Sequence, residues 1–271
     1  MRYADLHLHT TYSDGTRSPR EVVDLARSFD LNIIAISDHD NLAGFFEIHE
    51  YARQQQVLLI AATELSAEYR GIDIHVLAYA FDPLDENMNG RLASFRQARL
   101  SRGHAMIEKL RQGGYPLRTS RVEELCGGGA MGRPHIARAL IEAGYVTSMR
   151  QAFEQLLGTG CPGFVRKEKF SIGEAVSMVH SAGGLTVIAH PSLYPDHFTN
   201  VPQALSMGVD GIEIFHPDVD EASRDFYSAL AAERDLLITG GSDDHGSAKM
   251  TETIGTIRVP EGLIQRILDR V

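Results

Sequence analysis

The sequence is short of cysteine and of long apolar runs, and these shortages exclude several classes of protein. Only Cys126 and Cys161 occur in 271 residues, too few for a disulfide framework. No apolar run approaches the roughly 18 residues needed to cross a bilayer. The first residues also lack the basic and apolar layout of a signal peptide. We therefore expect a cytoplasmic protein that has no membrane partner.

Positive charge is also scarce. The chain has 26 Lys and Arg residues and 36 Asp and Glu residues, which gives a net charge of −10. This balance argues against broad binding of duplex DNA, which relies on basic side chains that displace counterions. The hydrophobic content of 43% and the charged content of 23% are near globular averages. We expect a compact chain with one large or two small domains rather than a disordered or fibrous one.

Seven short apolar runs rich in β-branched residues predict buried strands. They are Tyr3–Leu8, Asn32–Ser37, Val57–Thr63, Ile72–Tyr79, Leu185–Ala189, Gly211–Phe215 and Leu237–Thr239. Helical patterns lie between most of them, and capping boxes at Ser18 and Ser171 mark two helix starts. The alternation predicts a parallel α/β sheet, and seven strands favour a closed or nearly closed barrel. An open, doubly wound sheet is the alternative.

Residues 82–166 interrupt this alternation. They contain four helical patterns and no good strand: Asn87–Gln112, Ser120–Leu125, Pro134–Ala143 and Met149–Leu157. We expect a helical insertion that covers the mouth of the barrel. The first part of the barrel is then residues 1–81, and the second part is residues 167–271.

Histidines and carboxylates gather where the predicted strands end. The carboxyl ends of the strands of a β/α barrel form one mouth, so side chains from the whole chain are expected to meet there. His7 and His9 form an H-x-H pair on an extended segment, where the alternation turns both imidazoles to one side. The candidate metal ligands are nine in all: His7, His9, Asp14, His39, Glu64, His75, His190, Asp243 and His245.

This donor set predicts a site for two or three divalent metal ions. Nitrogen and oxygen donors without thiolate suit Mn²⁺, Fe²⁺ or Zn²⁺ better than Ca²⁺ or Mg²⁺. Three such ions would outweigh the three carboxylates, so we expect a positive pocket and an anionic substrate. Phosphate esters are the natural candidate, because clustered metal ions stabilise the attacking and leaving oxygens.

Together, these motifs resemble those of the PHP (polymerase and histidinol phosphatase) family of metal-dependent phosphoesterases. The run His7–Gly15 resembles the first motif of that family. The other motifs follow in order at Ser37–Asp40, Glu64, His75, Ala189–Pro191 and Gly241–His245. The resemblance implies a distorted (β/α)7 TIM-like barrel with a trinuclear metal centre, interrupted here by the helical insertion.

The resemblance also implies a role for each ligand. Glu64 would bridge two ions, one also held by His7, His9 and Asp243, and the other by His75 and His190. Asp14, His39 and His245 would hold a third ion. Manganese is the metal expected first. A hydroxide that bridges the metal ions would attack phosphorus, so no catalytic residue is expected beyond these ligands.

The insertion makes the chain most similar to the stand-alone TrpH/YciV-like subfamily. That resemblance implies hydrolysis of the 3′-phosphate of nucleoside 3′,5′-bisphosphates, such as adenosine 3′,5′-bisphosphate to AMP and phosphate. For some members it also implies 5′-to-3′ trimming of short RNA. The expected partner is a small nucleotide or a short single-stranded RNA. The alternatives are a histidinol-phosphate-type phosphatase and an amidohydrolase-type metal-dependent C–N hydrolase.

Six further residues are candidate contacts to the substrate: Ser13, Arg17, Arg133, His135, Lys167 and His216. Arg133 and His135 open a predicted helix whose backbone N–H groups can bind phosphate, although Arg133 in a surface ion pair is the alternative. His216 either orients the base or ribose, or supports a metal ligand. The arginines within Asn87–Gln112 are interpreted as the solvated face of an amphipathic helix.

Overall fold

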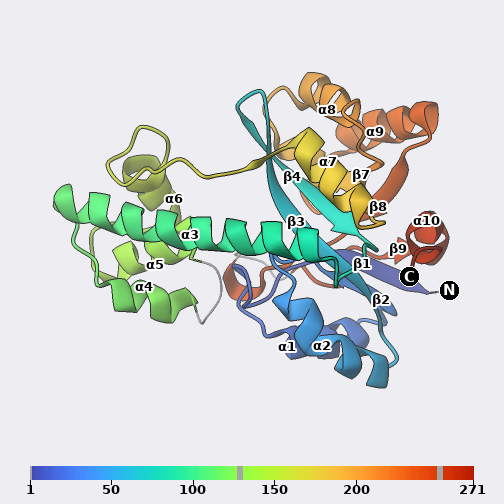
Figure 1. Cartoon of the computed structure of the whole chain (residues 1–271), viewed down its shortest axis with the longest axis horizontal. Helices are drawn as coiled ribbons and strands as arrows, with labels where there is room; N and C mark the ends of the chain where they lie inside the picture. Colours follow the sequence, from blue (N-terminus) through green and yellow to red (C-terminus); the bar gives the residue numbers. More distant parts are fainter. Residues whose placement is uncertain (1, 127–130, 249–252) are drawn as a thin grey trace.

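The computed structural model describes residues 2–126, 131–248 and 253–271 of a mixed α/β fold (Figure 1). Within these residues, a curved sheet of nine strands has the order β8-β7-β6-β4-β3-β2-β1-β9, and β5 pairs with β3. A bridge from Leu8 to Asp244 links β1 to the segment that follows β8. The sheet is therefore nearly closed, and the prediction of a distorted TIM-like barrel is confirmed.

Most strands lie where the apolar runs predict them. Their bounds are β1 (Tyr3–Leu8), β2 (Ile33–Ile36), β3 (Leu58–Tyr69), β4 (Ile72–Tyr79), β5 (Phe170–Ser171), β6 (Leu185–Ile188), β7 (Gly211–Phe215), β8 (Leu237–Gly240) and β9 (Val259–Pro260). The short strands β5 and β9 were not expected. The pairs β1–β2, β2–β3, β6–β7 and β7–β8 are parallel.

Strand β4 runs antiparallel to both of its neighbours, so the expectation of a wholly parallel sheet is wrong at this strand. Arg70 and Gly71 have φ of 51° and 83° and form the two-residue turn of a hairpin between β3 and β4. Strand β3 also continues to Tyr69, so Glu64 lies inside the strand rather than after it. The sequence contains no helix between these two strands, and that absence is the signal for a hairpin.

Helices cover the outside of the sheet and also form a separate group beyond it (Figure 1). They are α1 (Pro19–Ser28), α2 (Ala43–Gln54), α3 (Glu86–Gln112), α4 (Thr119–Cys126), α5 (Arg133–Glu142), α6 (Met149–Ala152), α7 (Ile172–Ser181), α8 (His197–Leu205), α9 (Glu221–Arg234) and α10 (Gln265–Leu268), with a π-helix η1 (Phe153–Leu157) and short 3₁₀ turns η2 (Pro191–Leu193), η3 (Gly246–Ala248) and η4 (Glu261–Ile264). The capping boxes predicted at Ser18 and Ser171 are both present. Over the described ranges, no helix has both the length and the apolar character that a membrane span requires.

Helix α3 runs from beside the sheet out to α4, α5 and α6 (Figure 1), and it contributes to two hydrophobic cores. Its 27 residues give a length of about 40 Å, so it extends beyond the barrel. Leu92 and Phe95 in its first half pack into the core between the sheet and its helices. Met106 and Leu110 in its second half join the core of α4, α5, α6 and η1, which we call the outer helices. The prediction that residues 82–166 form a separate insertion between the two parts of the barrel is not tested and stays a prediction.

The inside of the barrel changes from apolar to polar along the strands. Ile60 and Ala62 of β3 pack in one cluster with Leu77 of β4 and Val187 of β6. Two residues beyond Ala62, the same face of β3 carries Glu64. The apolar cluster therefore forms a floor beneath the polar end of the barrel.

A β-bulge in β1 turns two histidines toward this polar end. Between Asp5 and Leu8, β1 contains one residue more than the paired stretch of β2. Leu6 accordingly packs in the inner cluster, whereas Leu8 packs in the cluster beneath α1 and α2. An extra residue shifts the alternation, so each side chain that follows it points to the opposite face of the sheet. His7 and His9 consequently face inward together.

Gly241 is required for the close approach of β1 to the segment after β8. A Cβ at position 241 would lie 2.3 Å from the Cβ and 2.4 Å from the backbone nitrogen of His7. We expect Gly241→Ala to lower the free energy of unfolding by about 1–3 kcal/mol through overpacking. Gly90→Ala, on the exposed side of α3 with no heavy atom within 4 Å of the new Cβ, is the matched control. It is expected to raise stability by up to ~1 kcal/mol. Urea unfolding measures the free energy of unfolding of both variants. A similar change in the two would contradict the packing described.

Candidate metal centre

Glu64 lies at the centre of a cluster of imidazoles. Its side chain is 1% exposed, and its oxygens lie within 3.5 Å of ring nitrogens from five histidines. The distances are 2.7 Å to His75 Nδ1, 3.0 Å to His39 Nδ1, 3.1 Å to His190 Nε2, 3.3 Å to His9 Nε2 and 3.5 Å to His7 Nε2. Strands β1 and β4 and the loops after β2 and β6 thus meet at one carboxylate.

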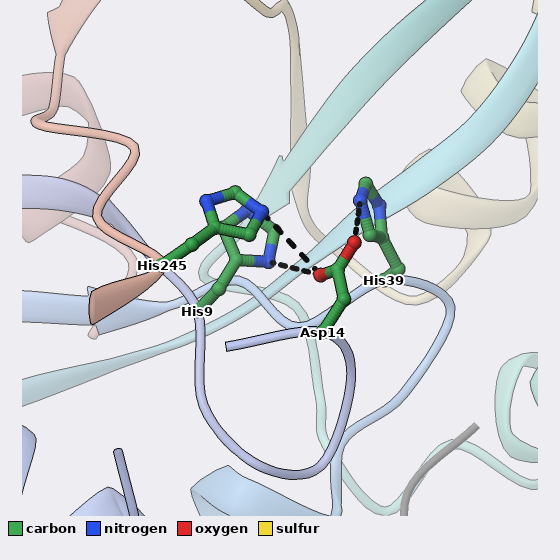
Figure 2. A group of neighbouring side chains, drawn as sticks. All are labelled: His9, Asp14, His39 and His245. Atoms are coloured by element: carbon green, nitrogen blue, oxygen red, sulfur yellow. Dashed lines mark ion pairs between the residues drawn. The ribbon is translucent and has the colours of Figure 1, made fainter. Parts of the chain in front are cut away.

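Two further carboxylates extend this cluster. Asp243 Oδ1 lies 3.2 Å from His9 Nε2 and 3.5 Å from His245 Nδ1. Asp14 lies among the rings of His9, His39 and His245, with nitrogen–oxygen distances of 3.4–3.8 Å (Figure 2). The structure therefore brings all nine predicted ligands together, whereas their roles as ligands stay a prediction.

Several buried atoms of the cluster make no hydrogen bond. They include Nε2 of His7, Nε2 of His9, Nδ1 of His39 and Oδ1 of Asp14. A buried polar atom without a partner is costly, and a metal ion is one way to satisfy several at once. Three groups of these side chains have donor atoms within 4.8 Å of one another. The nitrogen and oxygen donors suit a site for divalent transition-metal ions.

The protonation states of the cluster differ from one side chain to the next, and metal binding depends on them. Burial opposes ionisation of Glu64, but His75, His39 and His7 hold the pKa of its carboxyl well below the usual range. Burial lowers the pKa of His39 to about 4, so its ring is neutral at pH 7. Burial also disfavours the charged form of His9, but Asp243 and Glu64 raise its pKa to about 10. Metal binding at His9 therefore releases a proton.

Two of the nine side chains stand on a strained backbone. His190 has φ of 26° and Asp243 has φ of 48°, in a region that residues other than glycine rarely adopt. The backbone N–H of His190 donates to Glu213 Oε2 at 2.7 Å, which fixes the loop after β6. Such strain is typical of functional sites, where surrounding contacts hold the chain in an unfavourable conformation.

Buried carboxylates behind the cluster orient its rings. Glu213 of β7 lies 3.0 Å from His7 Nδ1 through Oε1, and Asp38 accepts a hydrogen bond from Ser13 Oγ at 2.6 Å. Such partners fix the ring orientation and tautomer of metal-binding histidines. The sequence patterns assigned no role to Glu213 or Asp38. The available signal was an acidic residue within or directly after an apolar strand, where burial without a partner is unfavourable.

Four cations lie together beside this cluster, and we call them the cationic group: Arg99, Arg102, Arg133 and Lys167. Burial and repulsion from Arg133 and Arg99 lower the pKa of Arg102 to about 10. Burial and Arg99 also lower the pKa of Lys167 to about 7, although Asp40 opposes this. Asp40, which lies 3.5 Å from Arg99, compensates part of this charge, and a bound anion would relieve the repulsion that remains.

The cationic group borders the imidazole cluster. Arg99 donates to the backbone oxygen of His39 at 3.2 Å, and Lys167 donates to the hydroxyl of Ser66, two residues beyond Glu64 in β3. The interpretation of the α3 arginines as a solvated face is wrong for Arg99, whose side chain is 12% exposed. Helical periodicity alone did not reveal that α3 passes close to the mouth of the barrel.

Two more candidate contacts to the substrate, Arg133 and His135, lie in the first turn of α5. The guanidinium carbon of Arg133 lies 5.5 Å from the centre of the Phe153 ring. His135 Nδ1 accepts a hydrogen bond from the backbone N–H of Gly132 at 3.1 Å. The neutral ring of His135 consequently carries its proton on Nε2, which makes that atom a donor.

Ser13, Arg17 and His216 contact other residues of the centre. Ser13 Oγ lies 3.3 Å from His9 Nδ1 as well as donating to Asp38. Arg17 pairs with Asp244. His216 is buried, and its Nε2 lies 3.5 Å from Asp243 Oδ2. These contacts support the imidazole cluster, and a direct contact of these three residues with substrate stays a prediction.

Two curated proteins resemble this chain over most of its length. A 5′-3′ exoribonuclease of Haemophilus influenzae is 34% identical, and the match covers 89% of each chain. A 3′,5′-nucleoside bisphosphate phosphatase of Chromobacterium violaceum is 29% identical, over 94% of this chain and 91% of the relative.

The fold and the sequence pattern agree with these relatives. A crystal structure of a Bifidobacterium adolescentis protein assigned as a metal-dependent phosphoesterase superposes with a TM-score of 0.88. It is 32% identical, and the match covers 98% of this chain and 96% of that one. The sequence pattern of the PHP domain matches residues 5–152. This chain therefore belongs to the PHP domain family.

Proposed function

We propose that this protein is a metal-dependent phosphoesterase that removes the 3′-phosphate of nucleoside 3′,5′-bisphosphates and also trims short 5′-phosphorylated RNA. The observation that carries the proposal is the cationic group beside the imidazole cluster. A substrate with two phosphates can place one at each of these sites. The names of the Haemophilus and Chromobacterium relatives support the same two substrates.

The nine clustered side chains fit two or three divalent ions, with Mn²⁺ as the first choice and Fe²⁺ or Zn²⁺ as alternatives. Glu64 would hold two ions, one together with His7, His9 and Asp243, and the other together with His75 and His190. Asp14, His39 and His245 complete the set. When bound, such ions stabilise charge on phosphoryl oxygens and activate water near neutral pH. Glu213 and Asp38 keep the rings in place.

The cationic group binds the phosphate that is not cleaved. Arginine and lysine form charge-assisted hydrogen bonds with phosphate oxygens. Arg99 and Lys167 are held by His39 and Ser66, so a phosphate on the group lies at a fixed place relative to Glu64. His135 donates to the substrate from Nε2, because its Nδ1 is occupied by the cap of α5. A nucleotide bound at both ends is thereby oriented for attack at its 3′-phosphate.

The substrate class is tested with Mn²⁺-loaded protein. We expect phosphate release from adenosine 3′,5′-bisphosphate, with little release from AMP or histidinol phosphate, because each of these carries only one phosphate. Released phosphate is measured by a colorimetric assay. Equal rates on histidinol phosphate would favour that phosphatase class instead. No release from any ester, with metal content verified, would favour a C–N hydrolase and refute the proposal.

Glu64→Gln removes the negative charge at the centre of the cluster while keeping its shape. We expect kcat/KM to fall by about 10³-fold or more, because metal ions contribute several kcal/mol to transition-state stabilisation. Metal analysis of the purified variant is expected to show fewer ions per chain. Glu68→Gln on the same strand is the matched control, since Glu68 pairs with Lys169 and not with the histidines. A fully active Glu64→Gln protein would remove Glu64 from the centre.

Lys167 gives the reaction a specific pH dependence. Its pKa of about 7 means that the charged form, which binds phosphate, is lost as the pH rises above 7. The arginine of the Lys167→Arg variant keeps its charge throughout the pH range from 6 to 9. We expect the ratio of kcat/KM between wild type and variant to fall by about 100-fold between pH 6 and pH 9, because the charged fraction of Lys167 falls by that factor. A constant ratio would show that Lys167 does not bind the phosphate in its charged form.

A further inference from the structure

A groove of about 560 Å³ lies between the start of α2 and the middle of α3. This volume is in the range of sites that bind small molecules, roughly 300–1,000 Å³. The function proposed above uses none of the residues that line it. Tyr12, Phe46, Leu100 and Met131 provide apolar surface, and Arg96 provides a positive charge.

The lining has the chemistry of a nucleotide site. Phe46 is 39% exposed and Leu100 is 38% exposed, so flat apolar surface is open to a ligand. Gln97 adds an amide group that both donates and accepts hydrogen bonds. Among the described residues that line the groove, none is acidic. Aromatic surface combined with positive charge is the usual means of binding single-stranded nucleic acid.

The groove is lined by the same two loops that carry residues of the metal centre, those of Tyr12 and Asn41. Asn41 is two residues beyond His39 in the same loop, and its amide donates to the backbone oxygen of Tyr12 at 2.8 Å. Arg96 donates to Asn41 Oδ1 at 3.3 Å. Arg96 also precedes Arg99 of the cationic group by three residues on α3, so the two side chains are on neighbouring turns of one helix face.

We propose that this groove binds the second nucleotide of a short, single-stranded RNA whose 5′-terminal nucleotide occupies the metal centre. The base of the second nucleotide lies against Phe46 and Tyr12, and the phosphate that follows it lies near Arg96. This inference rests on the proposed function, because the first nucleotide is the one held by the cationic group and the imidazole cluster.

The groove explains how one centre can act on both substrates. In each case water adds to phosphorus and the bond from phosphorus to the 3′-oxygen of the first nucleotide breaks. The 3′-oxygen leaves with a proton, which gives a 5′-mononucleotide with a free 3′-hydroxyl. The phosphate leaves either as inorganic phosphate or as the 5′-phosphate of an RNA that is one nucleotide shorter. Only the second case needs a site for a second nucleotide.

Phe46→Ala tests the base site. The substrates are 5′-phosphorylated triadenylate RNA and adenosine 3′,5′-bisphosphate, and kcat/KM is measured for both with Mn²⁺-loaded protein. Stacking of a base contributes ~1–3 kcal/mol, so kcat/KM for the RNA is expected to fall about 5- to 160-fold more than that for the bisphosphate. Leu84→Ala, at a residue that is 72% exposed and outside the groove, is the control for loss of apolar surface. Equal losses on both substrates would overturn the inference.

Arg96→Gln tests the phosphate contact without a large change in shape. The slope of log Kd for the RNA against log salt concentration is expected to decrease by about 0.7 for one lost phosphate contact. Kd is measured by calorimetry in EDTA, where no hydrolysis occurs. An unchanged slope would remove Arg96 from the site.

Failure of the proposed function has a different signature. In that case the wild-type protein hydrolyses neither substrate. The calorimetric Kd of triadenylate then still decides the inference, because weaker binding by Phe46→Ala supports an RNA groove and an unchanged Kd refutes it.

Discussion

The structure depends on the burial of one carboxylate, that of Glu64, inside a barrel. A buried charge is unfavourable unless other groups compensate it, and here imidazoles from four segments surround it. The bulge in β1 and the reversal of β4 both serve this arrangement, because they bring His7, His9 and His75 to the same level as Glu64. The apolar floor below keeps water from reaching the carboxylate from the other end.

Local sequence patterns predicted seven of the nine described strands, the barrel and the nine clustered side chains, because apolar runs and strand ends are local signals. They did not predict that β4 is antiparallel, since this depends on the two-residue turn at Arg70 and Gly71. They also missed Arg99, Glu213 and Asp38. The role of each of these residues follows from which segments lie next to it, and periodicity within one segment carries no such information.

The distribution of charge differs sharply from the net charge of the chain. The molecule carries −10 overall, yet the mouth of the barrel collects the cationic group and Arg96. A local positive region on a negative protein attracts anions only at short range and discourages broad contact with long polyanions. Such a field suits small phosphorylated ligands and short RNA.

The length of α3 fixes the position and rotation of the outer helices relative to the barrel. One unbroken helix carries Phe95 in the first core and Met106 in the second, with Arg96 and Arg99 between them. Each residue added to or removed from this stretch would rotate the outer helices by about 100° relative to the barrel. Only changes close to whole turns would keep both faces packed. Natural variation in length is therefore far easier to accommodate in the loops between the outer helices than in α3 itself.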